Sequence, residues 1–189
     1  MYKDRKKIKK KIVVDNKWLT VWKEAVQLPN GKVIPDYYFV KRSDVVIIVP
    51  VFNQKKVLVL RQWRPVPKNY IYNLPMGLLE KNESSPRKSA ERELYEETGL
   101  LPKKMIELGK FWRAPAYLTT KVHIFLALCG HSGGPRKNNV DNSEIFEKKI
   151  FSFDEARKKI TDLSSLAALL LAERIIKKLP SRRTTREGK

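Results

Sequence analysis

The chain has 189 residues, a single cysteine, and 40 Lys or Arg residues against 20 Asp or Glu, which gives a formal net charge of +20 at pH 7. This length is sufficient for one domain with a substantial core, and a single cysteine excludes an internal disulfide bond. The longest apolar run covers only residues 166–172, whereas a membrane-spanning helix needs about 20 apolar residues.

Much of the positive charge lies at the two ends of the chain. Residues 1–11 contain seven Lys or Arg and one Asp, a net charge of +6, and residues 177–189 contain six Lys or Arg and one Glu, a net charge of +5. We expect a basic tail at residues 1–11, a folded domain at residues 12–179 and a second basic tail at residues 180–189. Charge blocks of this kind are usually solvated, and they also predict weak, non-specific binding of nucleic acid.

The N-terminal region and the cysteine content favour the cytoplasm. The apolar run after the first basic block, Ile12–Val14, is too short for the apolar region of a signal peptide. A lone cysteine fits a compartment in which thiols stay reduced. We therefore expect a cytoplasmic protein that does not insert into a membrane.

The residues before position 80 predict a series of β-strands. Two runs rich in β-forming residues, 18–28 and 32–41, flank the turn sequence Pro29-Asn30-Gly31 and predict an N-terminal β-hairpin. The continuous apolar run at residues 45–52 predicts a buried strand. Two more strands are expected around a proline-containing break, at residues 57–63 and 70–74.

A helix is predicted to begin at Pro86 and to end before Gly99. Ser85 is a favourable N-cap, and a proline in the first turn is tolerated because its missing N–H group has no partner there. Gly99 supplies the left-handed conformation in which many helices end. Ala90 and Leu94 are spaced to place one side of this helix on a core.

The other side of the same helix carries Glu93, Glu96 and Glu97. These glutamates are neighbours at i, i+3 and i+4, and each like-charged pair costs about 0.2–0.5 kcal/mol. They also lie near the C-terminal end, where the helix dipole disfavours negative charge. Arg92 offsets only part of this cost. A hard cation with oxygen ligands would remove the penalty, and the alternative is an ordinary solvated surface.

Beyond the helix, three strands and two further helices are expected. The last helix has a wide Leu/Ala face that must cover a sheet. The strands are expected at residues 106–112, 122–129 and 145–151, and the helices at residues 153–160 and 163–179. A series of strands with one central and two C-terminal helices predicts an α/β or α+β sandwich.

The stretch from Gly77 to Leu100 resembles the Nudix box. That box is a glycine, five residues, a glutamate, seven residues, Arg-Glu, an aliphatic residue, any residue, Glu-Glu, any residue, a glycine and an aliphatic residue. The residues that match it are Gly77, Glu83, Arg92, Glu93, Leu94, Glu96, Glu97, Gly99 and Leu100. Eight residues separate Glu83 from Arg92, and we expect the extra one to lengthen the loop before the helix. The resemblance implies a mixed β-sheet between helices.

Segments outside the box are similar to the ADP-ribose pyrophosphatase branch of this family. Residues 61–65, RQWRP, are similar to an Arg-Gln-Tyr-Arg segment of the branch, and residues 74–77, LPMG, resemble its Leu-Pro-Ala-Gly stretch. Pro115 lies sixteen residues past the last glycine of the box, a spacing that marks the branch. Asn73 and Thr120 stand where the branch usually has acidic residues, so the substrate is less well defined than the reaction.

The resemblance also implies roles for individual residues. It implies a Mg²⁺-dependent hydrolase, with Mn²⁺ as an alternative, whose metal ligands are Glu93, Glu96, Glu97 and the Met76 carbonyl. Arg92 would orient the carboxylates through Glu83, and Arg64 would contact the substrate. The catalytic base of the branch is a glutamate in the loop before the last strand. Glu144 occupies that position, and Glu147 is the alternative.

The activity implied is hydrolysis of ADP-ribose or a related nucleoside diphosphate-X to a nucleotide and a phosphorylated X. The branch forms homodimers through the region of the N-terminal hairpin, so a homodimer is expected. Two alternatives are a Nudix enzyme acting on RNA 5′ ends or another polyanion, which the charge favours, and a non-catalytic nucleic-acid-binding module. The intact glutamates argue against the module, and no RNA-binding motif beyond charge supports the first alternative.

Overall fold

The computed structural model describes residues 10–80, 83, 85–130 and 146–179, which form two sheets and three helices. In chain order the elements are β1 (Lys11–Asp15), β2 (Thr20–Gln27), β3 (Val33–Lys41), β4 (Val45–Phe52), β5 (Lys56–Arg64), β6 (Asn69–Asn73), β7 (Met76–Leu78), α1 (Pro86–Thr98), β8 (Lys104–Trp112), β9 (Lys121–Cys129), β10 (Phe146–Ser152), α2 (Phe153–Lys159) and α3 (Leu163–Ile176). The strands predicted beyond the hairpin and the three predicted helices are present within this part of the chain, with ends shifted by at most three residues.

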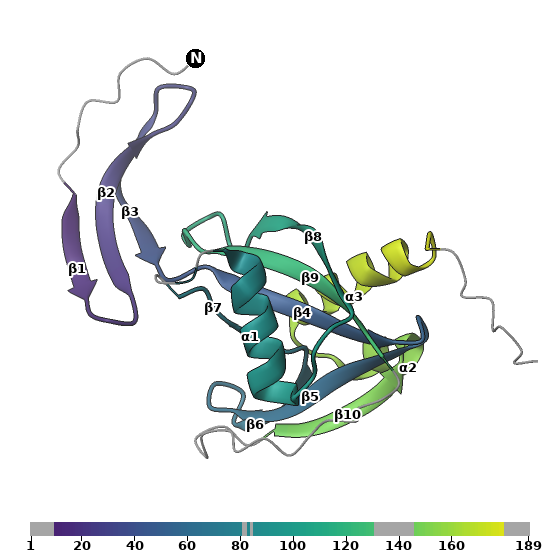
Figure 1. Cartoon of the computed structure of the whole chain (residues 1–189). Coiled ribbons are helices and arrows are strands. Elements are labelled where there is room, and N and C mark those ends of the chain that lie inside the picture. Colours follow the sequence, from purple (N-terminus) through teal and green to yellow (C-terminus); the bar gives the residue numbers. More distant parts are fainter. Residues whose placement is uncertain (1–9, 81–82, 84, 131–145, 180–189) are drawn as a thin grey trace, which may run out of the picture.

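The larger sheet is mixed and lies between helices. Its main path runs β10-β5-β4-β9-β8, while β6 pairs with β5 and β7 pairs with β4. Strands β4 and β9 are parallel, and the other pairs are antiparallel. Helix α1 covers one face of this sheet, and α2 and α3 cover the other (Figure 1). This arrangement confirms the predicted fold class.

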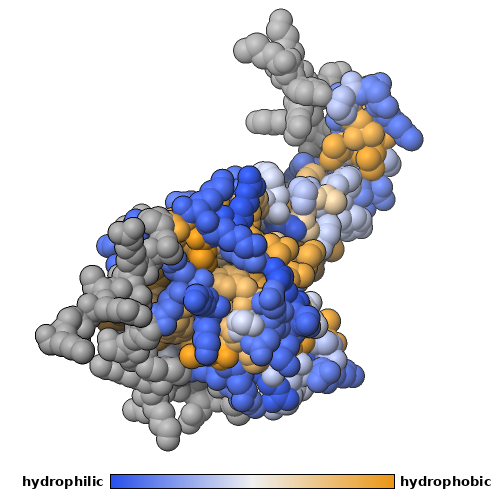
Figure 2. Space-filling view, turned by 90° about the vertical axis from the view of Figure 1, so that its right-hand side faces the viewer, coloured by the Kyte–Doolittle hydropathy of each residue, from blue (hydrophilic) through white to orange (hydrophobic). Residues whose placement is uncertain are grey.

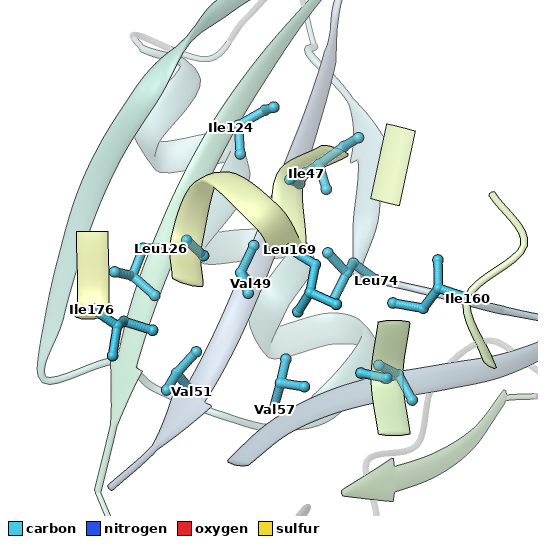
Figure 3. Packing of buried hydrophobic residues seen from close by; sticks show 14 of the residues in the cluster. Ile47, Val49, Val51, Val57, Leu74, Ile124, Leu126, Ile160, Leu169 and Ile176 are labelled. Carbon is cyan, nitrogen blue, oxygen red and sulfur yellow. The ribbon is translucent and has the colours of Figure 1, made fainter. Parts of the chain in front are cut away.

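Strand β4 supplies side chains to both faces of the sheet. Successive side chains of a strand point to opposite faces, so a strand with helices on both sides reads as one apolar run. Ile47 and Val49 pack with Leu169 of α3 (Figure 3), whereas Val46 and Ile48 pack with Leu94 of α1. The sheet therefore holds α1 in place through buried apolar side chains.

Helix α1 begins and ends where local signals predict. The Ser85 side chain accepts a hydrogen bond from the Lys88 N–H group, and Pro86 is the first helical residue. Gly99 has a φ of 75° and its N–H group donates to the Tyr95 carbonyl at 2.7 Å. The start and the end of α1 are therefore as predicted, and the position of the motif's extra residue in the preceding loop stays a prediction.

The N-terminal hairpin is confirmed, and it belongs to a small sheet of its own. Strands β2 and β3 are antiparallel and meet at Gly31, whose φ is 84°. Strand β1, which the sequence analysis did not predict, adds to the edge of β2, so Lys11 pairs with Lys23. This sheet extends away from the body of the molecule (Figure 1) and contains no buried residue among β1, β2 and β3.

None of the helices in the described residues combines the length and the apolar character that crossing a membrane would require. The longest of them, α3, has 14 residues and lies against the sheet. Its buried apolar residues, Ala168, Leu169, Ala172 and Ile176, belong to the core of the protein.

Candidate active site

Arg92 of α1 contacts several carboxylates at once. Its Nε donates to Glu83 Oε1 at 2.8 Å, and its Nη1 donates to Glu96 Oε2 at 2.8 Å. The same Nη1 lies 2.9 Å from Glu93 Oε1. Its Nη2 donates to the Leu78 carbonyl at 3.4 Å. One guanidinium group, with its several donors in a fixed fork, therefore joins α1 to β7 and to the loop before the helix.

The Arg92–Glu83 contact is the strongest electrostatic feature of this cluster. The hydrogen bond from Arg92 lowers the pKa of Glu83 from 4.5 to about 2, and the same contact raises the pKa of Arg92. The Ser89 hydroxyl also donates to Glu83. The sequence analysis did not single out Ser89, because a serine on the buried side of a helix is not distinctive. Glu83 remains ionised and holds Arg92 in position.

Gly77 of β7 leaves room for the carboxylate of Glu93. A Cβ atom at Gly77 would lie 1.9 Å from both Cδ and Oε1 of Glu93, so no larger residue fits without moving the glutamate. The Glu93 side chain is 14% exposed. Burial raises its pKa, and the neighbouring charge of Arg92 opposes this shift. The box glycine and the box glutamate are therefore packed against each other.

Glu97 contacts Met76, the residue before Gly77 in β7. Its Oε2 accepts a hydrogen bond from the Met76 N–H group at 3.0 Å, and the residue is 9% exposed. Met76 itself pairs with Ile47 of β4. Two glutamates one helical turn apart thus link α1 to β7. Glu93 packs against Gly77, and Glu97 accepts a hydrogen bond from Met76.

Arg64 ends β5, and Asn73 is its contact within the described residues. In the amide orientation that satisfies its surroundings, the buried Asn73 side chain accepts from Arg64 Nη2 at 3.1 Å and donates to the Leu60 carbonyl at 3.2 Å. A neutral amide holds this guanidinium group where the related branch usually has an acidic side chain. Arg64 is therefore held by a hydrogen bond to a neutral amide.

Of the two glutamates predicted as the catalytic base, Glu144 and Glu147, the described residues include only Glu147. Glu144 lies outside the described residues, so its prediction stays untested. Glu147 lies on β10, where its Oε1 is 2.7 Å from Arg61 Nη1 and its Oε2 is 3.4 Å from Lys149 Nζ. These contacts lower the pKa of Glu147. Glu147 is accordingly an ion-paired carboxylate on the sheet.

The donor chemistry of this region suits a hard divalent cation. The carboxylates of Glu93, Glu96 and Glu97 and the backbone carbonyls of β7 are all oxygen donors, which Mg²⁺ prefers. The partly desolvated Glu93 carboxylate over Gly77 carries charge that a cation would stabilise. In the described part of the chain, however, no three His, Cys, Asp or Glu side chains are gathered closely enough to hold a metal ion. The residue types fit, and the present rotamers favour Arg92 and Met76 as partners.

Two family models match this sequence. The model described as the NUDIX domain matches residues 41–171. The model described as the nucleoside diphosphate sugar hydrolase N-terminal domain matches residues 6–40. The boundary between them falls at the end of β3, where the small sheet meets the body.

The chain is also similar to characterised proteins and to a solved structure. It is 32% identical over 157 residues to the ADP-ribose pyrophosphatase of Bacillus subtilis, covering 83% of each chain. It is 28% identical over 174 residues to the methanol dehydrogenase activator of Bacillus methanolicus, covering 88% of this chain and 91% of that one. A crystal structure of an ADP compounds hydrolase matches its fold with a TM-score of 0.77 at 21% identity, covering 95% of this chain and 100% of the other.

We expect Gly77→Ala to leave the fold intact and to displace the Glu93 carboxylate from its position over β7. The added methyl group would force Glu93 to move, since overpacking of this kind costs about 1–3 kcal/mol. Hydrolytic turnover should fall at least about tenfold, measured with the best substrate found for the wild type.

Gly130→Ala is the matched control for this substitution. Its Cβ would meet only the end of the Lys103 side chain, 2.5 Å from Cε, and that flexible chain can turn away. Equal turnover in the Gly77→Ala variant and the wild type would contradict the assigned role of the glycine.

Proposed function

This chain belongs to the NUDIX domain family, and we propose that it is a Mg²⁺-dependent pyrophosphohydrolase acting on ADP-ribose or a related nucleoside diphosphate-X. The products are a nucleotide and a phosphorylated X. The observation that carries this proposal is the contact of α1 with β7, in which Arg92 and Gly77 arrange the glutamates of the helix.

Four groups are proposed to hold the metal. They are the carboxylates of Glu93, Glu96 and Glu97 and the carbonyl of Met76. Bound there, Mg²⁺ or Mn²⁺ would neutralise charge on the diphosphate and lower the pKa of a water molecule. The existing contacts of Glu93 and Glu97 place both side chains against neighbouring residues of β7.

Arg92 and Arg64 have different roles in this proposal. Arg92 orients the glutamates, since it already contacts Glu93 and Glu96 and is itself fixed by Glu83. Arg64 binds the substrate, because a guanidinium fork matches phosphate oxygens or stacks on a base. The contact with Asn73 holds Arg64 in place and does not neutralise it.

Glu144 is proposed as the general base that takes the proton from the attacking water. A carboxylate can do this when it reaches within hydrogen-bond distance of the water in the bound complex. Glu147 is less suited, because Arg61 and Lys149 occupy its two oxygens and lower its pKa. This ranking agrees with the position of Glu144 in the sequence.

We also propose that the protein acts in the cytoplasm. Its lone cysteine, Cys129, is buried, and burial raises the pKa of the thiol to about 11. Such a thiol is structural and unreactive. A reducing compartment suits a chain that has one buried thiol and no disulfide.

Measuring hydrolysis across a panel of substrates tests this function. The panel is ADP-ribose, nucleotide sugars, dinucleoside polyphosphates, nucleoside triphosphates and RNA with a 5′-triphosphate. We expect the highest kcat/KM with ADP-ribose or a nucleotide sugar. The highest value with RNA would instead assign the net charge of +20 to substrate recognition.

Replacing Glu97 by Gln should lower turnover by about two orders of magnitude or more. Glutamine keeps the acceptor for the Met76 N–H group and the helix propensity, but it removes a ligand charge. Removing one like charge from the helix should leave the metal-free fold equally stable or slightly more stable. The check combines kinetics with thermal unfolding in EDTA, and undiminished hydrolysis in EDTA would refute metal dependence.

Glu144→Gln should reduce kcat by about 10²–10⁴-fold and change KM little, because a base acts chiefly in the transition state. Glu147→Gln is the paired variant and should retain most of its activity. Steady-state kinetics on both variants decide between them. A nearly normal Glu144→Gln and an inactive Glu147→Gln would move the assignment by three residues.

We propose that the protein is a homodimer in which the sheet β1–β3 contributes to the interface. Its large apolar residues are only partly covered, and Ile12 and Tyr38 are 54% and 48% exposed. Figure 2 shows apolar surface on the projecting sheet at the top of the view. Trp22 and Phe39 stack at 5.1 Å across its strands. A three-stranded sheet needs a buried face for stability, and a second copy would supply one.

Light scattering at micromolar protein concentration should report twice the chain mass of 22.1 kDa. Ile12→Glu should raise the dissociation constant of the dimer at least about tenfold, since a charge at an apolar contact is unfavourable. Val66→Glu is the control, because Val66 is 94% exposed in the turn between β5 and β6. A monomeric wild type would contradict the proposed dimer.

A further inference from the structure

The charge at the C-terminal end of α1 is only partly compensated by residues of the same helix. Its last turn contains Glu96 and Glu97 and no basic residue. Carbonyl groups at a helix C-terminus carry partial negative charge and need donors. The glycine cap provides one hydrogen bond, from Gly99 to Tyr95. Arg92, four residues before Glu96, pairs with that glutamate, so any further positive charge for this end has to come from another element.

Lys148 of β10 supplies that charge. Its Nζ donates to the Thr98 carbonyl at 3.1 Å. Lys148 pairs with Leu60 of β5, and Leu60 packs with Leu94 on the face of the sheet that α1 covers. The neighbouring Lys149 is exposed and contacts Glu147. Lys148 is thus the lysine of this strand that crosses to the helix.

The contact is made at the residue next to Glu97. The hydroxyl of Thr98 donates to the Leu94 carbonyl and accepts from the Leu100 N–H group, and Thr98 is fully buried. Its carbonyl remains for Lys148. The Thr98 carbonyl lies in the peptide group between Thr98 and Gly99, one residue after Glu97, so fixing it limits the movement of the helix end that carries Glu97.

The last turn of α1 is consequently attached to two different strands of the sheet. The Glu97 carboxylate accepts from Met76 of β7, and the Thr98 carbonyl accepts from Lys148 of β10. Burial lowers the pKa of Lys148, so keeping an ammonium group here is unfavourable in isolation. Its hydrogen bond to the Thr98 carbonyl places the charge at the negative end of the helix dipole.

We propose that Lys148 is a positioning residue for the hydrolytic reaction, which holds the last turn of α1 so that Glu97 is correctly placed. This inference rests on the proposed function of Glu97. Lys148 acts through the helix backbone and does not touch the substrate. A displacement of about 1 Å at a catalytic group can cost up to about 10²-fold in rate.

Three substitutions separate this role from simple packing. Lys148→Met removes the donor and the charge but keeps an unbranched stem, Lys148→Gln keeps a donor without charge, and Lys148→Arg keeps both. We expect kcat to fall about tenfold or more in Lys148→Met with KM within about twofold, and Lys148→Arg to remain within about threefold of the wild type. Lys148→Gln should lie between them.

Lys104→Met is the control, because Lys104 is an exposed lysine at the start of β8. It should leave kcat unchanged. The unfolding midpoint of Lys148→Met should stay within about 5 °C of the wild type, since loss of the hydrogen bond is offset by loss of the desolvation cost. Unchanged kcat in Lys148→Met would overturn the proposal, as would a loss of kcat that Lys148→Arg does not restore.

Two measurements do not require turnover. Hydrogen exchange of the Gly99 and Leu100 amides should accelerate at least about fivefold in Lys148→Met, and calorimetric affinity for Mg²⁺ alone should weaken. If the wild type cleaves no substrate in the panel, the proposed function fails while these two measurements still decide on Lys148. Unchanged exchange and unchanged Mg²⁺ affinity would refute the positioning role. If Lys148→Met fails to fold, Lys148→Gln gives the same comparison.

Discussion

The charge of α1 is the constraint on which the candidate site depends. Three glutamates near the C-terminal end of one helix repel one another and oppose the helix dipole. Arg92 on the same helix pairs with Glu93 and Glu96, and Lys148 from β10 donates to the Thr98 carbonyl at the helix end. Glu83 in turn fixes Arg92. These contacts hold together acidic groups that would otherwise repel one another.

The sheet turns this local cluster into a defined site. Strand β7 is only three residues long, but its pairing with β4 fixes its position relative to α1. Gly77 then admits the Glu93 carboxylate, and Met76 donates to Glu97. The apolar contact of Leu94 with β4 sets the distance between helix and sheet. Apolar packing, hydrogen bonds to the backbone and ion pairs therefore all stabilise the same contact, the one between α1 and β7.

The small sheet β1–β3 differs from the larger sheet, since none of its strand residues is fully buried by the part of the chain that the structure describes. Its hairpin was predictable because Asn30-Gly31 is a local turn signal. Strand β1 was not, because five residues beside a basic block have no periodic pattern and their pairing depends on β2. The pairing of β1 with β2, which places Ile12 opposite Trp22, is set by tertiary contacts.

The sequence by itself determined α1, from the Ser85 cap to Gly99, and the spacing of its glutamates. Capping and helical periodicity act over a few residues, so they can be read without knowing the fold. Only the tertiary structure decided that Asn73 holds Arg64, that Arg61 pairs with Glu147, and that Lys148 reaches Thr98. The residues of these contacts are separated by 9 to 86 positions or lie on different elements, and the side chain of a lysine or arginine carries no local signal of its partner. Strand order and register bring them together, because they are set by burial over the whole sheet.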